Sequence, residues 1–310
     1  MEAWFLRQRL ELIRMSKDEK QRFDLQLAII TNNVKKIDEI IQGIGVEAVS
    51  NSIRLMNRST PLSLAIYKNN KPALDHLLQH PFNLNRLSCD HLGRIEPPLC
   101  SAVRLGNKAI ITKLLSFQSI NVNQFDFFGQ TPLWLAVRDR RFDIVQSILQ
   151  HDSFRLDLSL FVKSRTSPVY LAAKYLKRGR EEMFELLLKS GLPFICIDMD
   201  HGGDDPDADV VYVAGQTVLF EVAVVHHAYH FIRQLINAGL NVYCFRDKFA
   251  NPIIRQTIRE CHPRSLAAEC RLTVRRQLIQ KLNVPITQEL VRKNFPKLPG
   301  KLLKYLCDLT

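Results

Sequence analysis

The sequence lacks any apolar run that approaches the ~18 residues needed to cross a bilayer. Its N-terminal segment carries charges inside what would be the apolar core of a signal peptide. Its seven cysteines form no Cys-x-x-Cys pair, and their number is odd. These absences argue against secretion, a disulfide framework and a cysteine zinc site. We therefore expect buried, reduced thiols in a protein of the cytoplasm or nucleus.

Catalytic and phosphate-binding motifs are also missing from the sequence. No Ser/His/Asp or Cys/His set is recognisable, and Gly202-Gly203 lies among aspartates that would repel a phosphate. His226 and His230 share the spacing of one helix face, but no carboxylate or cysteine lies at matching spacing. We therefore interpret these histidines as structural or surface residues and expect no enzyme activity, no cofactor and no metal ion.

The charge is unevenly distributed along the chain. The formal net charge is +12, and residues 264–310 hold ten Lys or Arg against three Asp or Glu, while residues 198–209 hold six Asp and no basic residue. A nucleic-acid surface would combine basic residues with aromatics along one face, and that pattern is absent. Nucleic acid is therefore not an expected partner. A basic adaptor at a membrane surface stays as an alternative, although no membrane partner is expected.

What the sequence does contain is an internal repeat. Its strong copies are Thr60-Pro-Leu-Ser-Leu-Ala-Ile66, Pro97-Pro-Leu-Cys-Ser-Ala-Val103, Thr131-Pro-Leu-Trp-Leu-Ala-Val137 and Ser167-Pro-Val-Tyr-Leu-Ala-Ala173, and weaker copies begin at Phe23 and Thr217. The successive steps are 37, 37, 34, 36 and 50 residues. An insertion over 200–214 explains the long last step.

Each part of the repeat has a structural role. A Thr or Ser hydroxyl caps a helix that Pro begins, and the small Ala lets helices approach closely. A second helix is predicted by apolar residues at spacings of three and four, as in the third strong copy. The residues of that face are Phe142, Ile144, Val145, Ile148 and Leu149. We expect helix pairs over 60–78, 97–115, 131–149 and 167–188.

This pattern resembles the ankyrin repeat, whose core reads Thr-Pro-Leu-His-Leu-Ala-Ala at a period of about 33 residues. The resemblance covers residues 22–258, although no copy keeps the His. It implies an all-α solenoid of about six repeats, with residues 1–21 as an N-terminal capping helix. We expect the 200–214 insertion to be an exposed loop.

An ankyrin array acts through its surface, where it binds other proteins. One predicted hairpin is crowded with aromatics, and arginines follow it closely in the sequence. Aromatic and Arg side chains are the usual anchors of binding hot spots. The candidate target-binding residues are Phe125, Phe127, Phe128, Arg138, Arg140 and Arg141. The alternative is that one or two of the phenylalanines pack between repeats.

A separate amphipathic segment follows Pro263 and begins with Ser265 as a candidate cap. Apolar residues recur every fourth position on one face, and Arg271, Arg275 and Arg276 point away from that stripe. The stripe consists of Leu266, Cys270, Val274 and Leu278. Periodicity alone fits either a helix that caps the last repeat or one that docks into a groove of another protein.

The segment resembles the Elongin-binding box that opens a SOCS box, with the pattern Ser-Leu-x-x-x-Cys-x-x-x-aliphatic from Ser265 to Val274. Farther on, Phe295-Pro-Lys-Leu-Pro-Gly-Lys-Leu-Leu-Lys-Tyr-Leu306 is similar to the end of that module, although the first half of its Leu-Pro-x-Pro motif is degraded. Ankyrin repeats followed by such a box are typical of the ankyrin-repeat and SOCS-box family.

The family resemblance implies a substrate receptor of a ubiquitin ligase. Residues 264–310 would form a three-helix SOCS box, in which Leu266, Cys270 and Val274 bind Elongin C of the Elongin B/Elongin C pair. Leu298 and Pro299 would contribute to binding of cullin-5 with its RING subunit. The ankyrin repeats would hold an unidentified target protein. The alternative is an ankyrin inhibitor or scaffold without ligase function, in which the last helices serve only as a cap.

Overall fold

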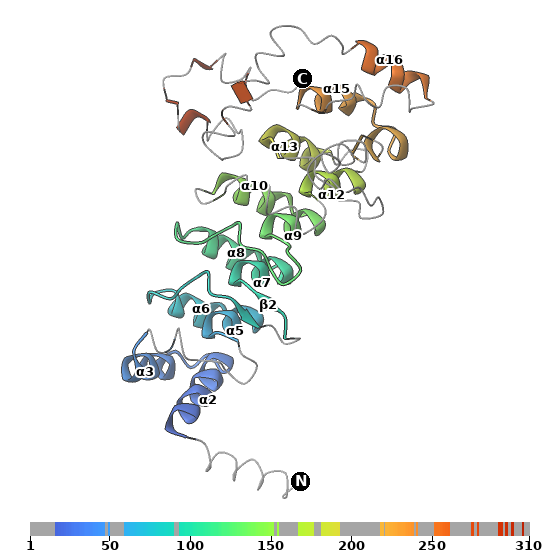
Figure 1. Ribbon diagram of the computed structural model, residues 1–310. Coiled ribbons are helices and arrows are strands. Elements are labelled where there is room, and N and C mark those ends of the chain that lie inside the picture. Colours follow the sequence, from blue (N-terminus) through green and yellow to red (C-terminus); the bar gives the residue numbers. More distant parts are fainter. Residues whose placement is uncertain are drawn as a thin grey trace, which may run out of the picture. The chain divides into compact units, whose positions relative to one another are not determined.

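A computed structural model describes residues 16–46, 49, 59–89, 93–151, 154, 167–176, 181–192, 218–219, 221–238, 240 and 251–260. It also describes isolated positions near the C-terminus, namely 274, 275, 278, 291–293, 295, 296, 299, 300 and 306. The described chain is mostly helical (Figure 1). Within it, no helix is both long and apolar enough to cross a membrane. The 200–214 insertion, residues 1–15, Leu266, Cys270 and Leu298 lie outside the described residues.

The chain divides into two compact units, one of residues 1–120 with 124–127 and one of residues 121–123 with 128–310. The described helices of the first unit are α2 (Lys17–Ile30), α3 (Val34–Ile44), α5 (Pro61–Tyr67), α6 (Lys71–Leu77), α7 (Pro98–Leu105) and α8 (Lys108–Leu115). First helices pack on first helices, α2 on α5 and α5 on α7, and α3 packs on α6. The first unit is thus a stack of helix pairs.

The second unit has the same plan. Its described helices are α9 (Pro132–Arg138), α10 (Phe142–Gln150), α12 (Pro168–Lys174), α13 (Glu182–Ser190), the π-helix η1 (Glu221–Val225), α15 (His230–Asn237) and α16 (Pro252–Glu260). α9 packs on α12 and α10 on α13, while α12 contacts η1. The four expected helix pairs are confirmed across the two units.

The predicted caps explain where the first helices begin. The hydroxyls of Thr60, Thr131 and Ser167 each accept a hydrogen bond from the backbone N–H three residues on, at 3.2, 3.2 and 3.1 Å. Proline occupies the first turn of all three helices. Each cap contributes about 1 kcal/mol to stability. The Thr/Ser-Pro signal therefore defines the repeat boundaries directly.

Two details of the helical pattern differ from the expectation. The helix expected to begin the first repeat near Phe23 starts at Lys17, because Ser16 and Glu19 form a reciprocal capping box. The boundary drawn between residues 21 and 22 therefore falls inside α2. Phe142 was expected on the buried face of α10, but it lies at the first position of that helix and is 36% exposed. The other four residues of that face are buried.

A short antiparallel pair, β1 (Ser88–Cys89) and β2 (Ile95–Glu96), brings a carboxylate into the first unit. Glu96 is 1% exposed and accepts hydrogen bonds from Tyr67 Oη, Ser101 Oγ (2.7 Å) and Arg104 Nε (3.2 Å). The same guanidinium donates to the buried carboxylate of Asp126. The sequence patterns did not predict this buried charge network.

Cys100 lies beside the network, fully buried on α7. Burial raises the pKa of its thiol, and the negative charges of Asp126 and Glu96 raise it further. Because the thiolate is the reactive species, we expect Cys100 to resist a thiol reagent at pH 7–8 until the protein unfolds. Mass-spectrometric mapping of alkylated cysteines, with and without urea, measures this. Labelling of Cys100 as fast as that of the half-buried Cys89 would contradict the prediction.

Candidate protein-binding surface

The turn between α9 and α10 differs in sequence from the turns that join the two helices of each pair in the first unit. In the first unit this turn has a residue of positive φ followed by an Asn that caps the second helix: Asn32-Asn33, Asn69-Asn70 and Gly106-Asn107. Here the positive φ of 58° belongs to Arg140, and Arg141 makes no side-chain cap bond. Arg is disfavoured in the left-handed region. Departures from local rules often mark functional positions.

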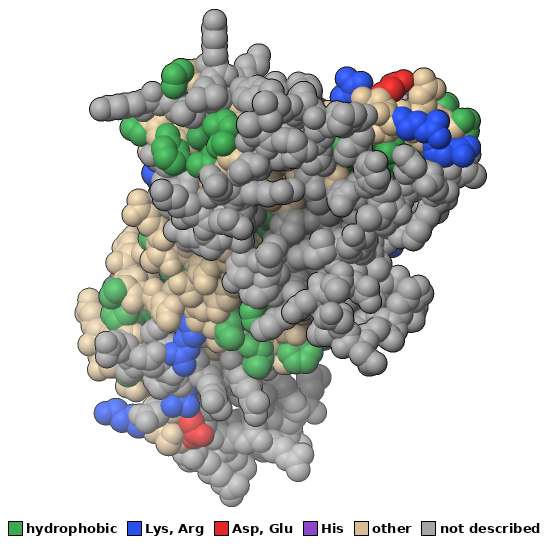
Figure 2. Space-filling model, turned by 45° about the horizontal axis from the view of Figure 1, so that its top comes forward, with side chains coloured by type: hydrophobic (Ala, Val, Ile, Leu, Met, Phe, Trp, Pro, Cys, Tyr) green, Lys and Arg blue, Asp and Glu red, His purple; other side chains and the backbone are tan. Residues whose placement is uncertain are grey.

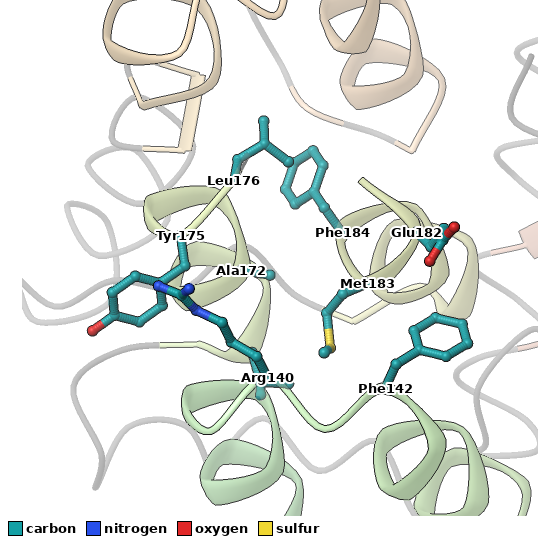
Figure 3. Close-up of a pocket in the computed structure, with 9 residues that line it drawn as sticks. Arg140, Phe142, Ala172, Tyr175, Leu176, Glu182, Met183 and Phe184 are labelled. Atoms are coloured by element: carbon teal, nitrogen blue, oxygen red, sulfur yellow. The ribbon is translucent and has the colours of Figure 1, made fainter. Parts of the chain in front are cut away.

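The Arg140 side chain is held by an aromatic neighbour from the next helix pair of the same unit. Its guanidinium carbon lies 5.1 Å from the centre of the Tyr175 ring, within the range of a cation–π contact. Figure 3 shows this pair at one side of a hollow between the α9–α10 turn and α12–α13. The guanidinium is therefore kept at the surface and is only partly desolvated.

The hollow has a volume of about 240 Å³ and carries both apolar and charged groups (Figure 3). Phe142 and Met183 give it an apolar wall, which explains why Phe142 is not part of the buried face of α10. Arg140 and Glu182 supply opposite charges. The remaining lining residues are Val137, Ala172, Tyr175, Leu176 and Phe184. A hollow of this composition can accept one apolar side chain of a protein partner.

The other two expected arginines are engaged with near neighbours. Arg138 lies 5.8 Å from the centre of the Trp134 ring and donates two hydrogen bonds to Asp139, at 2.8 and 3.2 Å. Arg141 lies 4.0 Å from the same carboxylate. Both are therefore partly neutralised, and of the three arginines Arg140 is the one that lines the hollow.

The hairpin phenylalanines differ in exposure. Phe127 is 68% exposed and Phe128 is 48% exposed, whereas Phe125 is half-buried. Phe125 and Phe127 belong to the first unit and Phe128 to the second. Exposed apolar side chains occur in several separate groups on the face shown in Figure 2. The expectation that some of these phenylalanines pack inward therefore applies to Phe125 and not to the other two.

The C-terminal segment contains two adjacent residues with opposite surroundings. Val274, on the predicted docking stripe, is 39% exposed. Arg275 is 3% exposed and donates hydrogen bonds to the backbone carbonyls of Leu306 (2.6 Å) and Lys189 (3.1 Å). Lys189 lies in the last turn of α13, where a cation is favourable for the helix dipole. At this position the charged side chain faces the protein and the apolar one faces outward.

Pro299 of the second candidate motif is exposed, whereas Val291 and Leu306 are buried. The positions that would contact cullin are therefore accessible where the structure describes them. Leu278, the last residue of the stripe, is half-buried.

The histidines near residue 226 do not converge on one point. His226 Nε2 lies 3.2 Å from the Lys174 carbonyl, and His230 Nε2 lies 3.2 Å from Glu181 Oε2. His227 Nδ1 instead lies 3.2 Å from the Tyr229 hydroxyl. Each histidine thus has its own partner, in agreement with a structural or surface role.

The sequence was compared with curated proteins and with models of protein families. A search of curated proteins found no match. Residues 99–198 match the family model described as ankyrin repeats, in three copies. The matched range runs from the second residue of α7 to beyond α13. The chain therefore contains ankyrin repeats, a domain type that binds other proteins.

Proposed function

We propose that this protein is the substrate-recognition subunit of an Elongin B/Elongin C–cullin-5 RING ubiquitin ligase. The ankyrin repeats bind the target, and residues 264–310 form the SOCS box. Leu266, Cys270 and Val274 bind Elongin C, and Leu298 and Pro299 contribute to cullin binding. The protein is an adaptor without catalytic residues of its own.

The single observation that carries this proposal is the orientation of residues 274 and 275. A helix that merely capped the last repeat would bury its apolar stripe against the protein. Val274 is instead exposed, while its neighbour Arg275 is buried against the end of α13. An exposed apolar side chain on a segment that is fixed from its other side is suited to a hydrophobic groove of a partner.

The proposed target-binding residues belong to the hairpin and the α9–α10 turn, with Phe125 and Phe127 in the first unit and the others in the second. Phe127 and Phe128 supply exposed aromatic area, and Arg140 supplies a charge beside the hollow. Arg138 and Arg141 flank it, and Phe125 supports the hairpin from a half-buried position. Exposed aromatic side chains and an Arg beside a hollow each fit the composition of binding hot spots.

Coexpression with Elongin B and Elongin C tests the function. We expect the wild-type chain to copurify with the pair, and Leu266→Ser with Cys270→Asn to abolish capture. Full burial of a Leu side chain contributes about 1.5–3 kcal/mol, so losing Leu266 alone weakens binding by about 10- to 150-fold, and a polar Asn at position 270 weakens it further.

Two control variants accompany that experiment. Leu298→Ala with Pro299→Ala should keep Elongin capture and lower only cullin-5 capture. Phe127→Ser, at a site remote from the box in sequence, should keep both. A wild-type chain that never captures Elongin, together with a Leu266/Cys270 variant that unfolds the repeats, would instead favour the inhibitor or scaffold without ligase function.

A further inference from the structure

We propose that Asp38, His76 and His80 form a binding site for one zinc ion in the first unit. Asp38 lies on α3, His76 lies in the last turn of α6, and His80 lies just after that helix. α3 and α6 pack against each other as second helices of neighbouring pairs (Figure 1). The site therefore joins two neighbouring helix pairs of the first unit.

The three ligand atoms already lie within 4.8 Å of one another. Asp38 Oδ1 is 2.5 Å from His76 Nε2 and 3.8 Å from His80 Nε2. A tetrahedral zinc ion with bonds of about 2.0–2.1 Å holds its ligand atoms about 3.3 Å apart. Zinc binding thus requires the Asp38–His76 pair to separate by less than about 1 Å and His80 to approach by about 0.5 Å.

His80 provides a second, independent observation. Its Nε2 atom is buried and has no hydrogen-bond partner among the described residues, because 3.8 Å from Asp38 is too long for a hydrogen bond. Buried polar atoms are nearly always paired. A coordinated metal ion would satisfy this nitrogen with the ring in nearly its present position.

The turn that carries His80 is well held. The His80 N–H donates to the Leu77 carbonyl at 3.1 Å, and the Phe82 N–H donates to the His80 carbonyl at 2.7 Å. The His80 ring meets the His76 and Phe82 rings edge to face, at centroid distances of 5.7 and 6.4 Å. Both imidazoles are therefore positioned before a metal ion arrives, which reduces the entropy lost on binding.

The donor set determines the choice of metal. Two imidazoles and one carboxylate suit zinc, whereas Mg²⁺ and Ca²⁺ prefer oxygen ligands alone. The side chains of His76, His80 and Asp38 are 16%, 26% and 38% exposed. An ion can therefore enter, and a water molecule can take its fourth position. Because the ligands come from two helix pairs, zinc binding stabilises the folded first unit.

Zinc titration of the full chain, freed of metal with a chelator, tests the site by calorimetry and thermal unfolding. We expect one zinc ion per chain and a rise in Tm of about 5 °C at a zinc concentration of about 100 times Kd. His80→Gln and Asp38→Asn should each weaken binding by at least about 100-fold, since even an outer-shell partner contributes 10–100-fold. His230→Gln, which changes an exposed histidine paired with Glu181, is the matched control and should bind as the wild type does.

Absorption of the Co²⁺-loaded protein identifies the ligands. The site predicts the d–d bands of tetrahedral Co²⁺ without thiolate charge-transfer bands. Thiolate bands would place the metal on cysteines and overturn the proposal. It is equally overturned if His80→Gln and Asp38→Asn bind zinc as tightly as the wild type, or if zinc leaves the wild-type Tm unchanged. Asp38→Asn can still hydrogen-bond to His76, so its loss of zinc affinity reports on the carboxylate rather than on folding.

Discussion

Replacing Arg104 with Met should lower the free energy of unfolding of the first unit by about 3–5 kcal/mol, the cost of removing one partner from a buried ion pair. Arg104 is the cation that holds two buried carboxylates: Glu96 is 1% exposed and Asp126 is 4% exposed. Without the guanidinium, two neighbouring carboxyl groups would lose the cation that pairs with them while staying hidden from water. The Tyr67 and Ser101 hydroxyls still donate to Glu96, but a hydroxyl carries no compensating charge.

Hydrogen exchange of residues 98–115 is the measurement, because the amides of α7 and α8 report on the first unit separately from the rest of the chain. Neutralising both acids together with the arginine, as Arg104→Met with Glu96→Gln and Asp126→Asn, should recover part of the loss. The recovery follows because the triple variant leaves no buried charge unpaired. A loss below about 1 kcal/mol for Arg104→Met alone would mean that the carboxylates gain access to water and that the network is not a buried one.

The helix pairs could be predicted because their signals are local. A Thr or Ser cap, a Pro and an Ala lie within six consecutive residues, and the structure confirms the pairs and the caps at Thr60, Thr131 and Ser167. The start of α2 was missed because its capping box, Ser16 with Glu19, lies outside the repeat pattern. Local signals of a second kind, the capping Asn residues of the second helices, were present in the sequence and would have located the turns.

The buried groups could not be predicted in the same way, because their partners lie far apart in the sequence. From the sequence, Glu96 and Arg104 look like ordinary surface charges. In the structure, β2 and α7 place them beside Asp126. Likewise, His76 and His80 share the spacing of one helix face, but their carboxylate partner lies 38 residues before His76, on another helix pair. Sequence periodicity describes one helix at a time and does not show which residues of neighbouring repeats meet.

The binding role of the hairpin residues stays a prediction. The structure shows only that Phe127 and Phe128 are exposed and that Phe125 is half-buried. The sequence could not distinguish among three nearby arginines. The distinction arises from the positive φ of Arg140 and from its contact with Tyr175, which depends on the packing of the next helix pair.

The C-terminal segment illustrates the same limit. Apolar spacing placed Arg275 away from the stripe that contains Val274, but it did not show what the guanidinium would meet. In the structure it connects the carbonyl of Leu306, near the end of the chain, with the carbonyl of Lys189 on α13. This connection fixes one side of the segment to the repeats of the second unit and leaves Val274 exposed.

Substitutions at these two neighbouring positions should therefore differ in their effect on stability. Arg275→Met removes two hydrogen bonds from a charged donor, each contributing about 1.5–3 kcal/mol, so we expect the second unit to lose at least about 3 kcal/mol of stability. Val274→Asp changes a surface residue, so its free energy of unfolding should stay within about 0.5 kcal/mol of the wild type. Urea denaturation of each full-length variant gives both values.

Elongin capture should then depend on Val274 more directly than on Arg275. Val274→Asp would place a charge in an apolar groove, and we expect at least about a tenfold weaker capture of the Elongin B/Elongin C pair by a fully folded protein. Val274→Ile is the matched control, since it keeps an aliphatic side chain at the same position and should retain capture. Normal capture by Val274→Asp would contradict a docking role for the stripe, whereas unfolding of that variant would show that Val274 is a core residue of a cap.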